Sequence, residues 1–287
     1  MGRAPLAQAI AAYADCLPDI LAFCRACAEF RAGLKGWYPS NHLSSLHDLG
    51  LILCIFAAAT LYSSVGHAGA SGYLASMALF AVAPEQMKPA ALVLNILVAV
   101  IGTTRFVLAK AFSPRLFLPL ALGSVPFAFL GGTWTLPDKT YRIVVGVLLF
   151  IAAVRLAIQS RQPDRDPVPA PVWQTVPLGM GIGLLSGLTG VGGGIYLTPV
   201  ILFAGWARPR EASGVSAAFI LVNSVAGLGG KMQSALTLPA QLPLWAVAAV
   251  VGGLLGSYLG VRRMPSIWMR RTLAVVLLIA ALKLAFS

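Results

Sequence analysis

Two glycine-rich stretches hold the residues whose types and spacing could bind a ligand. The first stretch runs from Gly66 to Gly72 and the second from Gly187 to Gly194. Glycines at this density break a helix, and a helix that begins after the break directs free N–H groups and a positive dipole end at an anion. The predicted backbone donors are those of Gly69, Ala70, Ser71, Gly72, Gly192, Gly193 and Gly194.

Polar side chains inside the apolar segments extend this predicted anion site. Asn95 and Asn223 lie at matching positions, where an amide in lipid needs a partner, and we expect them to orient the ligand; contact between helices is the alternative. Two serines would add hydroxyls and two basic residues would add a positive field: Ser63, Ser186, Arg105 and Lys231. Both basic residues lie near segment ends, so they could instead reach to the membrane interface.

One residue of the first stretch titrates near neutral pH. Two roles stay open for His67, which are to donate a hydrogen bond only or to carry a coupling proton as well. No Asp or Glu lies in the interior of an apolar segment, which argues against a cation pathway or a carboxylate proton relay. The same lack of paired acids argues against a membrane enzyme. We therefore predict no catalytic residue, no cofactor and no metal in the membrane.

The composition decides which elements must position these residues. Of the 287 residues, 58% are hydrophobic and 10% are charged, against roughly 45–50% and 25% in soluble domains. This apolar excess must face lipid, which only helices or closed barrels can span. The apolar stretches run for about twenty residues without alternation, as helices do. The sequence predicts an all-α integral membrane protein.

Ten apolar segments follow one another along the chain. Eight are predicted as full spans, whereas 73–83 and 195–206 are too short to cross and directly follow the two glycine stretches. The segments are 49–65, 73–83, 90–110, 115–134, 141–159, 173–188, 195–206, 214–230, 242–261 and 268–286. Gly252, Gly256 and Gly260 have the spacing of close helix packing, and we assign them no ligand.

The segments form an internal repeat of two halves. Residues 141–158 align without a gap with residues 269–286, and Leu94-Asn95 aligns with Val222-Asn223. Five segments per half is an odd number, so the halves are predicted to have opposite orientations, as in inverted-repeat transporters. The predicted parts are a polar N-terminal extension 1–47, a first repeat 48–159, a proline-rich charged linker 160–172 and a second repeat 173–287.

The net charge of +12 is interpreted as a record of membrane orientation. The basic residues lie singly or in pairs, which argues against nucleic acid as a partner. The loops richer in basic residues all fall on one side, which predicts that both termini are periplasmic. Four basic residues of the N-terminal extension argue for the opposite orientation: Arg3, Arg25, Arg31 and Lys35.

The N-terminal extension also contains the spacing of a zinc site. Cys24, Cys27, His42 and His47 follow one another in the order C-x2-C and H-x4-H. Pro39 interrupts the helix on which such histidines usually lie. We therefore interpret these cysteines as incidental.

The glycine stretches resemble the paired signature of the TauE/SafE sulfite exporter family. The resemblance is carried by GLLSGLTGVGGGIYLTP (183–199) and YSSVGHAGASGYLA (62–75), and it covers about residues 49–286. It implies a permease for sulfite or a related sulfur oxyanion or organosulfonate in a bacterial inner membrane. Ala68 and Ala70 depart from a glycine-richer pattern. An anion channel, a carboxylate permease and a scaffold subunit remain alternatives, and a homodimer is left open.

Overall fold

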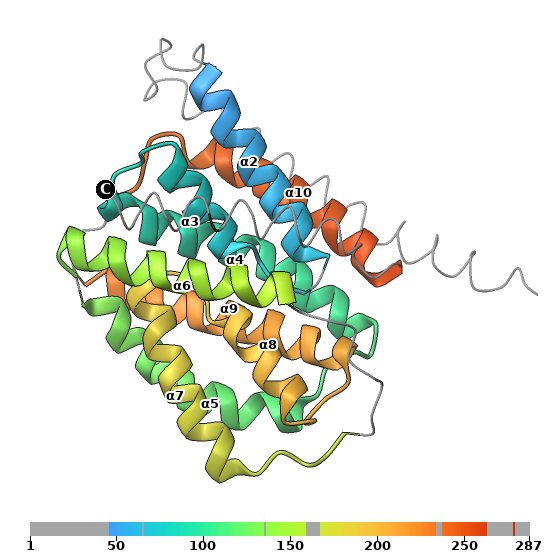
Figure 1. The fold of residues 1–287 in the computed structure, drawn as a ribbon. Helices are drawn as coiled ribbons and strands as arrows, with labels where there is room; N and C mark the ends of the chain where they lie inside the picture. Colours follow the sequence, from blue (N-terminus) through green and yellow to red (C-terminus); the bar gives the residue numbers. More distant parts are fainter. Residues whose placement is uncertain are drawn as a thin grey trace, which may run out of the picture. The chain divides into compact units, whose positions relative to one another are not determined.

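The computed structural model describes residues 46–64, 66–134, 136–158, 167–233, 237–262 and 278. All regular elements within these ranges are α-helices (Figure 1). Their bounds are α2 Leu46–Ser63, α3 Ala70–Leu79, α4 Pro84–Leu108, α5 Pro114–Thr133, α6 Asp138–Ile158, α7 Val172–Thr189, α8 Gly194–Phe203, α9 Pro209–Lys231 and α10 Leu242–Arg262.

Each of the first nine predicted segments coincides with one of these helices, and the predicted number of full spans stays a prediction. Several of them begin at a proline, among them α4, α5 and α9, because the first helical position needs no backbone N–H donor. The tenth segment, 268–286, lies outside the described residues except for Leu278. The predicted extension up to residue 45, with three of the four candidate zinc ligands, lies outside them as well, as does the side chain of His47.

The helix lengths agree with a protein that lies in a membrane. Four described helices are long and apolar enough to cross a bilayer: α4, α5, α9 and Leu242–Leu259 of α10. By contrast, α3 and α8 have ten residues each, which is about 15 Å of helix against a hydrocarbon core of about 30 Å. The two short helices therefore match the two segments that the sequence marks as too short.

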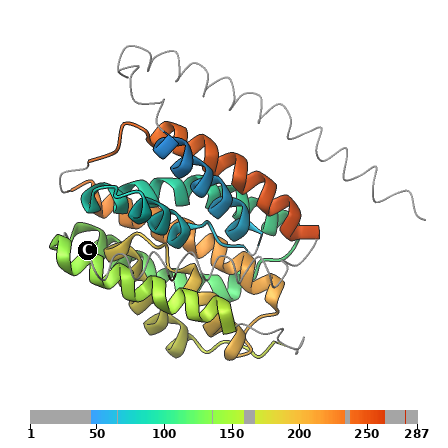
Figure 2. The same ribbon diagram turned by 45° about the horizontal axis from the view of Figure 1, so that its top comes forward.

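Helices from different halves of the sequence pack closely in two pairs. The first pair is α5 with α7, and the second is α2 with α10. In Figures 1 and 2 the α2–α10 pair and the α5–α7 pair lie on opposite sides of α4 and α9. The residues in contact rise together along both partners, so each pair is parallel: Leu120 with Gly179, Ser124 with Gly183, Ala128 with Gly187, Phe56 with Gly252 and Thr60 with Gly256.

Glycines make both of these interfaces close. A Cβ on Gly183 or Gly187 would overlap the carbonyl of Ser124 or Ala128 in α5, and a Cβ on Gly256 would overlap the Thr60 carbonyl in α2. Small residues at such crossings let two backbones approach each other in a membrane. The structure confirms the close-packing interpretation of Gly252 and Gly256.

Between the two pairs, α4 and α9 run antiparallel. Gly102 of α4 faces Ala217 of α9, and the Ala111 carbonyl just after α4 meets Gly214 near the start of α9. At the other end, Lys88 of α4 and Gly230 of α9 both contact the last turn of α5. The first turns of each helix therefore lie beside the last turns of the other.

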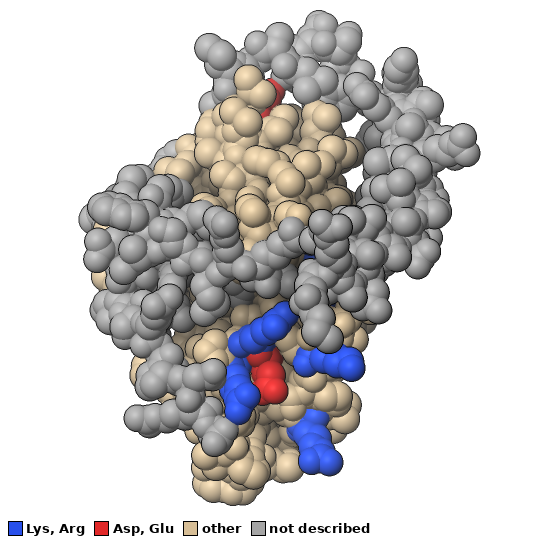
Figure 3. All heavy atoms as spheres, turned by 90° about the vertical axis from the view of Figure 1, so that its right-hand side faces the viewer, with Lys and Arg blue, Asp and Glu red and all other residues tan. Residues whose placement is uncertain are grey.

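Two of the basic loops predicted to share one membrane face lie at the same end of α4 and α9. The α4–α5 and α8–α9 connections are brought together by the contact of Ala111 with Gly214. Their exposed basic residues are Lys110, Arg115, Arg208 and Arg210. Figure 3 shows Lys and Arg side chains grouped around acidic atoms on one face of the molecule.

Candidate functional site

Each glycine stretch is a break between two helices. The residue before α3 is Gly69, with φ 101°, and the residue before α8 is Gly193, with φ 78°. Gly66, Gly190 and Gly192 also have positive φ. Residues with a Cβ rarely adopt this conformation. The glycines are therefore needed to turn the chain from the end of one helix into the start of the next.

In both breaks, several backbone N–H groups donate no backbone hydrogen bond. Among the backbone hydrogen bonds of the described residues, none is donated by the N–H groups of residues 69–72 or 192–194. These groups belong to the helix starts, where the first turn has no partner within the helix. The predicted donors of both breaks therefore have no acceptor among these backbone hydrogen bonds.

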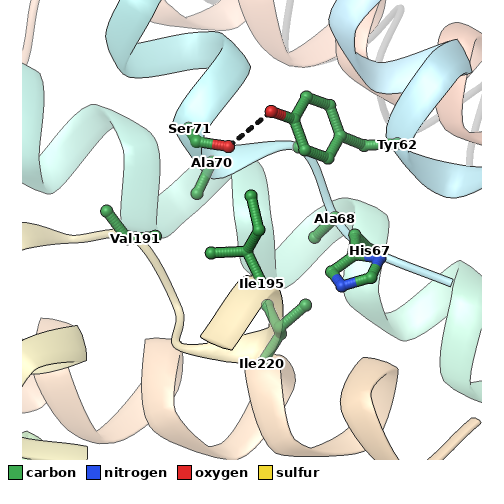
Figure 4. Close-up of a pocket in the computed structure, with 9 residues that line it drawn as sticks. Tyr62, His67, Ala68, Ala70, Ser71, Val191, Ile195 and Ile220 are labelled. Atoms are coloured by element: carbon green, nitrogen blue, oxygen red, sulfur yellow. Dashed lines mark hydrogen bonds between the residues drawn. The ribbon is translucent and has the colours of Figure 1, made fainter. Parts of the chain in front are cut away.

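A small cavity lies between the two breaks (Figure 4). The free space between its atoms, including its open mouth, is about 200 Å3. His67, Gly69, Ala70 and Ser71 are the predicted site residues that line it. The other lining residues were not predicted as site residues: Tyr62, Ala68, Val191, Ile195 and Ile220. None of the described lining residues is Asp, Glu, Lys or Arg.

Two hydrogen bonds, each involving a tyrosine hydroxyl, fix the first break. Ser71 Oγ donates to Tyr62 Oη at 2.6 Å, and Tyr73 Oη donates to the Ala68 carbonyl at 2.5 Å. All three of these side chains are buried. Figure 4 shows the Tyr62–Ser71 pair on one side of the cavity, with Ile195 between that pair and Ile220. The position of Tyr62 just before the glycine stretch is the sequence signal for its role.

His67 joins the two breaks. Its Nε2 lies 3.1 Å from the Gly194 carbonyl oxygen and 3.1 Å from Thr198 Oγ1. Gly194 is the first residue of α8, and Thr198 lies one turn further along the same helix. An imidazole from the first half therefore contacts the start of the short helix in the second half.

The paired asparagines are buried but make different contacts. Asn95 Nδ2 donates to the Gly190 carbonyl at 3.4 Å, across to the second break, whereas Asn223 Nδ2 donates to Phe219 in its own helix at 2.8 Å. Both side chains are fully buried, and neither Oδ1 has a hydrogen-bond partner within the described residues. Neither asparagine lines the cavity. In this structure Asn95 links α4 to the end of α7, which is a contact between helices.

The remaining predicted residues lie away from the cavity. Ser63 and Ser186 are buried, and their hydroxyls have no partner within the described residues. Arg105 Nη1 donates to the Leu254 carbonyl of α10 at 3.2 Å. Lys231 is buried at the end of α9. Gly72 and residues 192–194 belong to the breaks without lining the cavity.

Lys88 is a basic residue of the second break that the sequence analysis missed. Its ammonium donates to the carbonyls of Gly131, Gly132 and Trp134 at 3.1–3.2 Å, and its side chain is 6% exposed. Lys231 lies close enough to repel it electrostatically. The sequence signal that could have identified Lys88 is Pro84, which marks the start of the helix before Lys88 and so places the lysine inside the helix.

Comparisons with known proteins agree with the membrane fold. The profile of the family described as "Sulfite exporter TauE/SafE" matches residues 51–284. A relative from Sinorhizobium fredii (strain NBRC 101917 / NGR234), "Probable membrane transporter protein y4hK", is 38% identical over 242 residues, which are 82% of this chain and 97% of the relative. No solved structure matches the chain.

Proposed function

The chain belongs to the sulfite exporter TauE/SafE family and is a membrane transporter, and from this premise we propose that it is a secondary transporter of a small anion. Sulfite or a related sulfur oxyanion or organosulfonate is the proposed substrate. It would bind between the two helix breaks and cross the membrane by alternating access.

The observation that carries this proposal is the cavity between the two breaks. Two helix starts with free backbone N–H groups and positive dipole ends flank it, and such groups bind anions. No described carboxylate lines the cavity to repel an anion. Val191, Ile195 and Ile220 form an apolar wall beside the donors. An organosulfonate would place its oxygens on the donors and its carbon chain on this wall.

The packing of the helices supports two halves in inverted orientation. In the proposed correspondence α2 matches α7, and α5 matches α10. The parallel α5–α7 contact then has its counterpart in the parallel α2–α10 contact, each joining one half to the other. The corresponding helices α4 and α9 run antiparallel. Movement of one half against the other would open the cavity alternately to either side.

The basic end of the molecule supports an orientation in a bacterial inner membrane. Loops rich in Lys and Arg stay on the cytoplasmic side, and four exposed residues of this kind lie in or beside the α4–α5 and α8–α9 connections. In the proposed topology these connections are cytoplasmic. Both termini would then be periplasmic.

His67 is proposed to carry the coupling proton because it lines the cavity and histidine is the residue type whose ordinary pKa lies near neutral pH. Asn95 is proposed to hold the second break in place through Gly190. Lys88 and Lys231 are proposed to supply positive field to the same break. Asn223, Ser63 and Ser186 are proposed to approach the ligand when the halves move.

Counterflow in proteoliposomes tests the proposed function. Vesicles loaded with unlabelled sulfite or ethanesulfonate should accumulate the radiolabelled anion transiently, with and without a pH gradient. Gly69→Val should abolish this accumulation, because its Cβ would meet the Tyr73 ring and its φ is positive. Gly181→Ala is the matched control, since no atom lies within 4 Å of the added methyl group.

The same assay separates the proposed transporter from its rivals. A channel would conduct the anion without transient accumulation against its gradient. Failure of both anions to show counterflow under every gradient would refute sulfur oxyanions as substrates. Carboxylates would then be the next class to test.

A further inference from the structure

We propose that Thr198 and Ser216 are positioning residues that hold His67 as the Nε2–H tautomer, so that its proton is exchanged at Nδ1. The role of this exchange in transport rests on the proposed function. The assignment of the tautomer does not depend on the proposed function. Neither residue was marked by the sequence, because nothing in their local pattern distinguishes them from helix-packing hydroxyls.

Three side chains from separate elements form one hydrogen-bonded chain. His67 Nε2 lies 3.1 Å from Thr198 Oγ1, and Thr198 Oγ1 lies 2.6 Å from Ser216 Oγ. Thr198 is 6% exposed and Ser216 is fully buried. The chain runs from the first break, across α8, to α9. It is therefore a polar contact between the two proposed halves at the edge of the cavity.

The Gly194 carbonyl selects the direction of these hydrogen bonds. It lies 3.1 Å from His67 Nε2 and accepts a hydrogen bond from Thr198 Oγ1 at 3.1 Å. A carbonyl can only accept, so Nε2 must carry a hydrogen; otherwise two lone pairs would face each other. The ring is then either the Nε2–H tautomer or the imidazolium. In both forms, the nitrogen that gains and loses a proton is Nδ1.

Ser216 fixes the direction of the Thr198 hydroxyl. Thr198 has one hydroxyl hydrogen, which points to the Gly194 carbonyl, so it accepts from Ser216 and offers a lone pair to His67. Without Ser216 the hydroxyl could turn and donate to Nε2, which would favour the opposite tautomer. Ser216 thus acts on His67 through Thr198, and touches neither the ring nor the cavity.

Few ionisable groups surround His67. Those on the packed elements are Tyr62 on α2, Tyr73 on α3 and Tyr196 on α8. On α9 the nearest charged residues are Arg210 and Glu211, which precede Ser216 by more than one turn. No charged side chain among the described residues lines the cavity. Histidine is the residue type among these whose ordinary pKa lies near neutral pH.

Protonation of His67 would link the two proposed halves to anion binding. Nδ1 is buried from solvent, and when it gains a proton the hydrogen bond from Nε2 to Gly194 becomes charge-assisted and stronger. The positive charge also attracts an anion to the cavity. Because coupling between sites is reciprocal, an anion bound there favours the protonated ring. Proton and anion would then move together.

Nitrogen-15 NMR of the full-length chain tests the tautomer without any transport. The protein has three histidines, so a His42→Gln and His47→Gln background isolates His67. We expect neutral His67 to show a protonated Nε2 and an unprotonated Nδ1. Thr198→Val and Ser216→Ala should each move the pH midpoint of His67 to lower pH by about 0.5 unit, because the protonated ring loses an acceptor. Thr198→Ser should restore the wild-type midpoint.

Ser257→Ala is the matched control, since its buried hydroxyl bonds only within α10. It should leave the His67 midpoint unchanged. A neutral Nδ1–H tautomer in the wild type would overturn the proposal, as would a Thr198→Val midpoint equal to that of the wild type. In counterflow, the pH profile should shift as the NMR midpoint does. If the wild type carries no anion while the NMR result holds, the proposed function fails and the assignment of Thr198 and Ser216 stands.

Discussion

The first and second helix breaks have similar backbone conformations but different surroundings. Both turn through a left-handed glycine directly before a ten-residue helix. In the first break, Gly66 packs against Ser213 of α9, whereas in the second Gly190 packs against Lys88 of α4. The first break contains an ionisable imidazole, and the second lies beside buried ammonium groups.

This difference separates what the backbone supplies from what side chains supply. N–H groups without a backbone acceptor occur in both breaks, so the proposed anion donors are common to them. The titratable group belongs to the first break. The fixed positive charge belongs to the second, with Lys88 tied to the end of α5. We infer a proton-sensing break and a charge-supplying break around one anion.

The largest expected effect comes from crowding the second break. Gly192→Ala would place a methyl group 2.9 Å from Asn95 Nδ2 at a positive φ, which should destabilise the protein by about 2–3 kcal/mol. Thermal unfolding in detergent measures the loss, with Gly181→Ala as the control. A Gly192→Ala variant as stable as the control would contradict the tight second break.

Removal of the buried charge should have the next largest effect. Lys88→Met leaves three carbonyls at the C-terminal end of α5 without their donor, at a cost of about 2 kcal/mol. The equivalent first-break change, Ser213→Ala, loses one hydrogen bond within its own helix and should cost less than about 0.5 kcal/mol. Denaturation of both variants compares the two breaks. Equal losses of stability in the two variants would show that the Lys88 charge does not stabilise the second break.

Replacement of the two asparagines should have smaller effects, which should differ in the affinity for the anion. Asn95→Ala removes a contact to the second break, and Asn223→Ala removes one within α9. A membrane hydrogen bond between helices contributes about 1 kcal/mol, so Asn95→Ala should weaken anion binding about fivefold more than Asn223→Ala. Titration calorimetry with sulfite measures both. A stronger effect of Asn223→Ala would place the ligand nearer to α9.

The smallest effect should come from the Tyr62–Ser71 pair of the first break. Tyr62→Phe and Ser71→Ala each remove the same hydrogen bond of 2.6 Å, at a cost of about 0.6 kcal/mol. Because they share one contact, the double variant should be no less stable than either single variant. Additive losses in thermal unfolding would mean that the two hydroxyls act separately.

Sequence reasoning located the helices and both breaks because these are local properties. Runs of apolar residues set the helix lengths, and the glycines at 69 and 193 mark positions that need a positive φ. The two short helices followed from length alone. Residues 69–71 line the cavity, and their role as anion donors stays a prediction.

Partners far apart in the sequence could not be predicted in the same way. Asn95 contacts a carbonyl 95 residues away, and His67 contacts a helix start 127 residues away. Such contacts depend on which faces of the helices meet, which periodicity does not specify. Lys88 illustrates the limit, since a basic residue near a segment end is typical of both an interface anchor and a buried cap.

Calorimetric binding of sulfite and ethanesulfonate to two cavity-filling variants tests the central claim most directly. Ala70→Val fills the cavity from the first break, and Val191→Phe fills it from the second. If one anion lies between the breaks, each variant should bind at least about tenfold more weakly, a loss of about 1.4 kcal/mol, and thermal unfolding checks that each variant stays folded. Wild-type affinity in either variant would contradict an anion site shared by the two breaks.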